Sequence, residues 1–164
     1  MAKNGEKLVW MVAIALLAGC MVGGCKKENS RTTPLASEEK HTAYHGGCLN
    51  ALGTCAAGHA EVKIEGDELK CWFVGGENQT DKAVRATDRE IVLTVTPKGG
   101  QEKKLTLLPR PDRLADEMVG DCSYFGGKAD WLAGVTEFKA TGLVNCKGQE
   151  RKLTIEYPKG YDPD

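Results

Sequence analysis

Polar and apolar residues alternate along residues 59–73, and this two-residue period constrains the fold more than any other feature of the sequence. Side chains two residues apart point to the same face of a β-strand. Ala60, Val62 and Ile64 therefore share one face of an extended segment. After a turn at residues 66–67 the alternation returns, with apolar positions at Leu69, Cys71 and Phe73. This pattern predicts a β-hairpin.

Two further segments, residues 89–108 and 137–158, repeat the pattern around turns at 98–100 and 147–149. Three hairpins with turns at short intervals predict an all-β fold, which we interpret as a small antiparallel, immunoglobulin-like β-sandwich of six or seven strands over residues 41–164. Residues 110–135 break the alternation, and only 129–134 suggests a short helical turn. The predicted core consists of Val62, Ile64, Leu69, Phe73, Ile91, Leu93, Val95, Leu105, Leu107, Phe138, Ile155 and Tyr157.

The first nineteen residues have the proportions of a secretory signal peptide, with two lysines followed by an uncharged apolar run. The run ends in Leu-Ala-Gly-Cys at Cys20, which resembles a bacterial lipobox, so we expect diacylglyceryl and palmitate modification there. Cys25, after Val-Gly-Gly, is the alternative lipidation site. An uncleaved membrane anchor over residues 8–25 is the other interpretation.

Residues 20–40 are then expected to form the lipidated N-terminus and a flexible tether, because residues 26–40 are polar and lack apolar periodicity. Neither Met21 nor Lys26 supplies the aspartate that, after a lipidated cysteine, resembles an inner-membrane retention signal. We therefore expect a cell-envelope protein anchored in the membrane by lipid and facing the periplasm, with the outer membrane favoured.

The composition argues against two classes of function. The formal net charge is −1 and no basic stripe is present, so a nucleic-acid partner is not expected. The sequence has no Gly-x-Ser-x-Gly, His-Glu-x-x-His, phosphate-loop or Cys-x-x-Cys motif, and its three histidines all precede residue 60. We therefore expect that the protein is not an enzyme and has no catalytic residues.

Five cysteines lie in the predicted domain, where an oxidising compartment would favour pairing. Cys71 and Cys146 fall on inward faces of different hairpins and are candidates for a bridge between sheets. Cys48 and Cys55, with six residues between them, are candidates for closing a small loop, and Cys122 is a competing partner. The alternative is that some of these cysteines are buried thiols.

Residues 41–61, HTAYHGGCLNALGTCAAGHAE, hold all three histidines and two of the cysteines. If this segment binds a metal, the predicted ligands are His45, Cys48, Cys55 and His59, with Glu61 orienting a ring and His41 as a spare ligand. Two thiolates with two imidazoles suit zinc or copper better than magnesium or calcium. The alternative is a structural turn at the two glycines, stapled by Cys48 and Cys55.

Three stretches, 44–53, 58–74 and 125–158, resemble a group of small bacterial periplasmic lipoproteins. The domain of that group opens with His-Gly-Gly, continues with His-Ala-Glu on a strand and closes on a Gly-Lys hairpin. The matching positions are His45, Gly46, Gly47, His59 and Glu61. Related segments occur beside heavy-metal efflux adaptors, so the resemblance implies metal handling. The five domain cysteines depart from the group's pattern.

Two functions follow as hypotheses. The first is a non-enzymatic, lipid-anchored periplasmic protein that binds a transition metal, with a metal efflux component or another envelope protein as partner. The second is a disulfide-stabilised structural or interaction domain for an envelope partner, with no role in metal binding.

Overall fold

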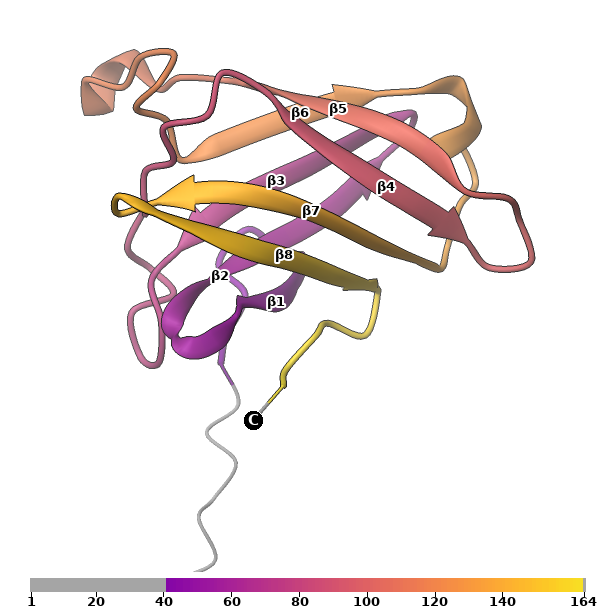
Figure 1. Ribbon diagram of the computed structural model, residues 1–164, viewed down its shortest axis with the longest axis horizontal. Coiled ribbons are helices and arrows are strands. Elements are labelled where there is room, and N and C mark those ends of the chain that lie inside the picture. The colour runs from indigo at the N-terminus through magenta and orange to yellow at the C-terminus, as the bar shows by residue number, and fades with distance from the viewer. Residues whose placement is uncertain (1–40, 164) are drawn as a thin grey trace, which may run out of the picture. The chain divides into compact units, whose positions relative to one another are not determined.

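The computed structural model describes residues 41–163, which form eight β-strands and two short 3-10 helices (Figure 1). The predicted signal peptide, both candidate lipidation cysteines and the predicted tether lie outside the described residues. Within residues 41–163, no helix has the length and apolar character needed to span a membrane. The elements are β1 (Cys48–Leu52), β2 (Thr54–Glu65), β3 (Glu68–Val74), β4 (Ile91–Pro97), β5 (Lys103–Pro109), η1 (Arg113–Ala115), β6 (Tyr124–Lys128), η2 (Asp130–Leu132), β7 (Phe138–Cys146) and β8 (Gln149–Tyr157).

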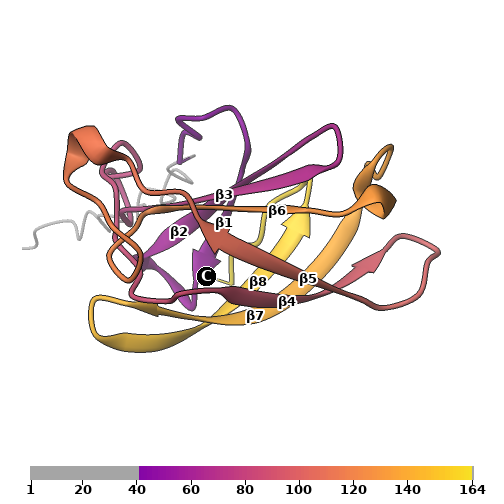
Figure 2. The same ribbon diagram turned by 90° about the horizontal axis from the view of Figure 1, so that it is seen from above.

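All strand pairs are antiparallel, in the order β1-β2-β3-β6-β5-β4-β7-β8. The sheet curls on itself, so that β3 and β6 lie above β4 and β7 in Figure 2. The three predicted hairpins are β2–β3, β4–β5 and β7–β8. The all-β antiparallel class is therefore confirmed. A sandwich of six or seven strands is not matched, because eight strands form one nearly closed, barrel-like sheet.

The strands that the sequence did not reveal are β1 and β6. In β6, Gly126 and Gly127 carry no side chain and so give no alternation. Gly127 is needed there, since a Cβ at this position would lie 2.6 Å from the backbone oxygen of Thr106. The absence of a side chain lets the neighbouring strand β5 approach closely.

The two edge strands, β1 and β8, meet through a buried asparagine and the segment that follows β8. The Asn50 side-chain oxygen accepts a hydrogen bond from the Glu156 amide at 2.9 Å, and its amide group donates to the Ala60 carbonyl at 3.3 Å. The Ala51 amide donates to the Tyr161 carbonyl at 2.7 Å, and the Tyr161 amide donates to the Leu49 carbonyl at 3.2 Å. Residues 160–162 thus cover the free edge of β1, which would otherwise expose unpaired backbone groups.

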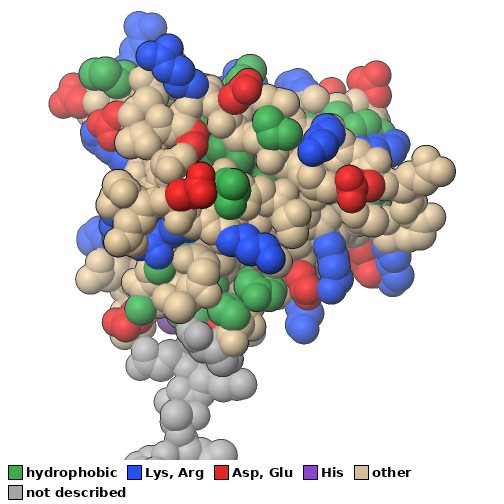
Figure 3. Space-filling view, viewed as in Figure 1, with side chains coloured by type: hydrophobic (Ala, Val, Ile, Leu, Met, Phe, Trp, Pro, Cys, Tyr) green, Lys and Arg blue, Asp and Glu red, His purple; other side chains and the backbone are tan. Residues whose placement is uncertain are grey.

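The core confirms the predicted inward positions. Ten of the twelve predicted core residues are buried, and Ile64 and Tyr157 pack against the core while partly exposed. On the face shown in Figure 3, positive and negative side chains are interspersed. The fold is therefore held by one apolar interior, as the alternation requires.

Candidate metal centre

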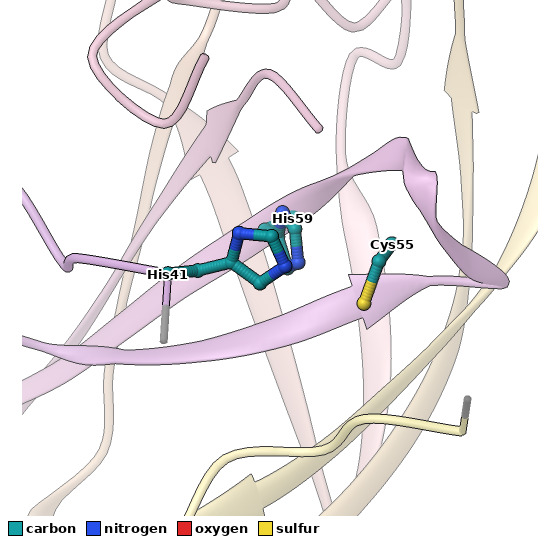
Figure 4. Close-up of side chains that lie close together, drawn as sticks. All are labelled: His41, Cys55 and His59. Carbon is teal, nitrogen blue, oxygen red and sulfur yellow. The ribbon is translucent and has the colours of Figure 1, made fainter. Parts of the chain in front are cut away.

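Two histidines and one cysteine come together beside β2. Cys55 and His59 lie on this strand, and His41 comes from the segment before β1. One ligand atom from each residue lies within 4.8 Å of the other two. Figure 4 shows the two imidazole rings next to each other, with the Cys55 side chain close by. Because Cys55 and His59 are four residues apart, the two-residue period of a strand brings them to the same face.

His59 is the buried member of the group, with 2 % of its surface exposed. Its Nδ1 lies 3.2 Å from the Gly75 carbonyl oxygen. A carbonyl only accepts hydrogen bonds, so Nδ1 must carry the proton and Nε2 of the neutral ring has a free lone pair. That Nε2 is buried and has no hydrogen-bond partner. Burial lowers the pKa of His59, which favours the neutral ring.

His41 is oriented in the same way. Its Nδ1 lies 2.8 Å from the Glu77 carbonyl oxygen, so Nδ1 donates and Nε2 carries the lone pair. The centroids of the His41 and His59 rings are 4.8 Å apart. Metal-binding histidines commonly donate their second ring N–H to a carbonyl or carboxylate, which fixes the tautomer and the ring orientation. Both histidines have this arrangement.

Both carbonyls belong to the loop at residues 75–80, which follows β3. A Cβ at Gly76 would lie 2.3 Å from the Cys55 carbonyl oxygen, so only glycine allows the loop to approach β2 this closely. The Thr80 hydroxyl donates to the Thr42 carbonyl at 2.9 Å and holds the segment that carries His41. The loop therefore positions both rings.

Cys55 completes the group with a partly exposed thiol. Its Sγ lies 3.1 Å from Oδ1 of Asp162, and the thiol donates to this carboxylate. The groove around the group is lined mainly by the segment before β1 and the segment after β8, with further residues from β1, β2, β8 and the loop after β3. Two imidazoles and a thiolate are a ligand set for zinc or copper, whereas magnesium and calcium require oxygen ligands.

Of the four predicted ligands, the structure brings Cys55 and His59 together and adds His41, which was predicted as a spare. It does not bring His45 or Cys48 into the group. The β1–β2 register explains the position of Cys48, which lies opposite Val62 and not opposite Cys55. The Cys48 side chain is buried, and burial raises the pKa of its thiol.

His45 has a different set of contacts. Its Nδ1 lies 3.0 Å from Glu61 Oε2, and its ring stacks on Trp72 with centroids 4.4 Å apart and planes at 3°. Trp72 in turn stacks on Tyr124 with centroids 4.9 Å apart. His45 therefore belongs to an aromatic stack across β3 and β6.

Glu61 explains why His-Gly-Gly and His-Ala-Glu occur together in this chain. Its carboxylate is fully buried and accepts the backbone amides of Tyr44, His45 and Gly47 at 2.9, 2.7 and 2.8 Å. A Cβ at Gly47 would lie 2.5 Å from the Val62 carbonyl oxygen. Glu61 was predicted to orient a metal-bound ring, but it orients His45 and fixes the loop at residues 44–47.

The candidate disulfides are not formed within the part of the chain that the structure describes. No bridge joins two of the five cysteines there. Cys71 and Cys146 both lie in the apolar core, and burial raises the pKa of each thiol, that of Cys146 to about 11. Cys122 is also buried, and its thiol donates to the Tyr124 carbonyl at 3.0 Å.

Comparison with protein-family models, curated proteins and solved structures finds no match to this chain. The resemblance to periplasmic lipoproteins therefore stays a prediction made from short motifs.

Proposed function

We propose that the domain binds one transition-metal ion, zinc or copper, through His41, Cys55 and His59. The observation that carries the proposal is the buried Nε2 of His59, which has a lone pair and no hydrogen-bond partner, on a ring that offers a ligand atom within 4.8 Å of two further ligand groups. We further propose that the protein holds the ion without acting as an enzyme.

The energetics of His59 support this proposal. Leaving a buried acceptor unpaired costs about 1–3 kcal/mol, so a histidine whose only role was packing would destabilise the domain by about that amount. A bound metal ion would use the lone pair and remove that cost. The neutral state of His59, favoured by burial, is also the state that a metal ligand requires.

The arrangement of the two tautomers supports the proposal independently. Each ring donates through Nδ1 to a backbone carbonyl of the same loop, at 2.8 Å for His41 and 3.2 Å for His59. In the neutral form of both rings the lone pair is thereby left on Nε2. A cluster with only a structural role would not need both rings in this tautomer.

Metal titration tests the proposal. Reduced, metal-free protein is titrated with zinc and, separately, with cuprous ion, in competition with a chromophoric chelator. We expect one equivalent to bind, Cys55→Ser to weaken binding strongly, and Cys48→Ala to bind as the parent does. Equal binding by the parent and Cys55→Ser would refute the proposal. Binding that is lost in both Cys55→Ser and Cys48→Ala would favour the ligand set predicted from sequence.

We also propose that the domain is attached to the cell envelope through lipid at Cys20 and faces the periplasm, where it would present metal to an efflux component. The support is the sequence of residues 1–20. Metabolic labelling with a fatty-acid analogue should be lost in Cys20→Ser and retained in Cys25→Ser. The reverse result would move the lipid to Cys25.

A further inference from the structure

The geometry points to Asp162 as the fourth ligand of the ion, so that zinc would join the segment before β1, strand β2 and the segment after β8. This inference rests on the proposed metal binding by His41, Cys55 and His59. Its starting observation is the 3.1 Å distance between Oδ1 of Asp162 and Sγ of Cys55.

The distance between Cys55 and Asp162 suits a shared ion. Zinc binds sulfur at about 2.3 Å and carboxylate oxygen at about 2.0–2.2 Å, which places the two ligand atoms of a tetrahedral site roughly 3.6 Å apart. The observed 3.1 Å between Sγ and Oδ1 is about half an ångström shorter. Sγ and Oδ1 need only separate slightly, and the imidazole nitrogens, within 4.8 Å of Sγ and of each other, need to approach by roughly 1 Å. The Asp162 carboxylate is not among the atoms that lie within 4.8 Å of one another, so on binding it has to move toward the two imidazoles while it stays next to Cys55.

Backbone contacts that do not involve the Asp162 side chain place this residue at the site. Tyr161 exchanges two hydrogen bonds with β1, to Ala51 at 2.7 Å and to Leu49 at 3.2 Å. Gly160 has φ = +86°, and a Cβ there would lie 2.4 Å from the Leu49 carbonyl oxygen. Only glycine combines this conformation with this approach, so the chain is held against β1 immediately before Asp162.

Charge distinguishes between the two candidate metals. A Cys55 thiolate and the Asp162 carboxylate together carry two negative charges, which a divalent ion neutralises and a monovalent ion does not. A set of two imidazoles, one thiolate and one carboxylate therefore favours zinc over cuprous copper.

A four-residue shell has a structural consequence. His41 is the first residue that the structure describes, and Asp162 lies in the segment that covers the edge of β1. An ion bound by both would hold the two ends of the domain against β2. It would also fill the coordination sphere with protein ligands, which is typical of sites that hold a metal and not of sites that activate water.

The test compares Asp162→Asn with Glu150→Gln, which removes an exposed carboxylate at the start of β8. Zinc affinity should fall at least about tenfold in Asp162→Asn and stay at the parent value in Glu150→Gln, while cuprous affinity should change in neither. In the parent, zinc should slow hydrogen exchange at the Tyr161 amide, and Asp162→Asn should lose this protection.

Failure of this inference is distinguishable from failure of the proposed function. If Asp162→Asn and Asp162→Ala both bind zinc as tightly as the parent while Cys55→Ser does not, the domain binds metal without Asp162 and the fourth-ligand assignment is wrong. If Cys55→Ser and His59→Ala also bind as the parent does, the metal site itself is wrong.

Discussion

Replacing Glu61 with glutamine tests how the loop at residues 44–47 is held. The Glu61 carboxylate is fully buried and accepts three backbone amides and the His45 ring. Glutamine keeps the size but replaces one oxygen with an NH₂ group, which meets N–H donors instead of accepting from them. At least one buried donor then loses its partner, at about 1–3 kcal/mol, and the remaining hydrogen bonds lose the charge that strengthens them.

We therefore expect Glu61→Gln to lower the free energy of unfolding by about 3 kcal/mol, which corresponds to a fall in melting temperature of roughly 10 °C for a domain of this size. The measurement is urea denaturation of the metal-free protein. Glu65→Gln is the matched control, because Glu65 is an exposed carboxylate at the end of the same strand. Its ion pairs with Lys63 and Lys70 are exposed to solvent, so its loss should change stability by less than about 1 kcal/mol. Equal stability of Glu61→Gln and Glu65→Gln would refute the reasoning.

Three further predictions concern the site and the core. Gly76→Ala should reduce zinc affinity at least about tenfold in the titration described above, because a Cβ there would lie 2.3 Å from a backbone oxygen of β2 and would displace the loop that orients both rings. The metal-free domain should lose stability in urea as the pH falls below about 6.5. An unfolded histidine takes up a proton near that pH, whereas the folded His59, whose pKa is lowered by burial, does so only at lower pH. The contribution of His59 to stability is then fully present above the pKa of the unfolded histidine. A His59→Asn variant should show a smaller slope of the unfolding free energy against pH, and a slope equal to that of the parent would exclude His59 as the source of the pH dependence. Cys71 and Cys146, as buried thiols with raised pKa, should resist alkylation in the folded protein and react after unfolding without reductant, whereas a disulfide between them would require reductant.

The strands that could be predicted from sequence are those in which polar and apolar side chains alternate between the two faces of the sheet. In β2 and β3 the apolar residues alternate over a full hairpin, and the inward positions Val62, Leu69 and Phe73 are buried as expected. The same alternation cannot appear in β6, where two glycines leave no side chain at adjacent positions. Closure of the barrel depends on Asn50, a polar residue whose burial no apolar pattern signals.

The site was predicted in part for a similar reason. Cys55 and His59 lie on one strand with even spacing, so a local rule places them together. His41 joins them through the Glu77 carbonyl, in a loop whose path includes a positive φ of 50° at Glu77. That path depends on tertiary contacts and gives no local signal. His45 was assigned to the site because only two residues separate it from Cys48, but in the structure its ring contacts the Glu61 carboxylate at 3.0 Å.

The matched pair His41→Ala and His45→Ala tests the central claim most directly, since each variant removes one imidazole from the same short segment. Zinc binding to the reduced, metal-free proteins is measured by competition with a chromophoric chelator, and circular dichroism checks that each variant is folded. The geometry predicts that His41→Ala weakens zinc binding at least about tenfold and that His45→Ala binds one equivalent with the parent affinity. Parent-like affinity in His41→Ala together with a loss in His45→Ala would contradict the site described by the structure.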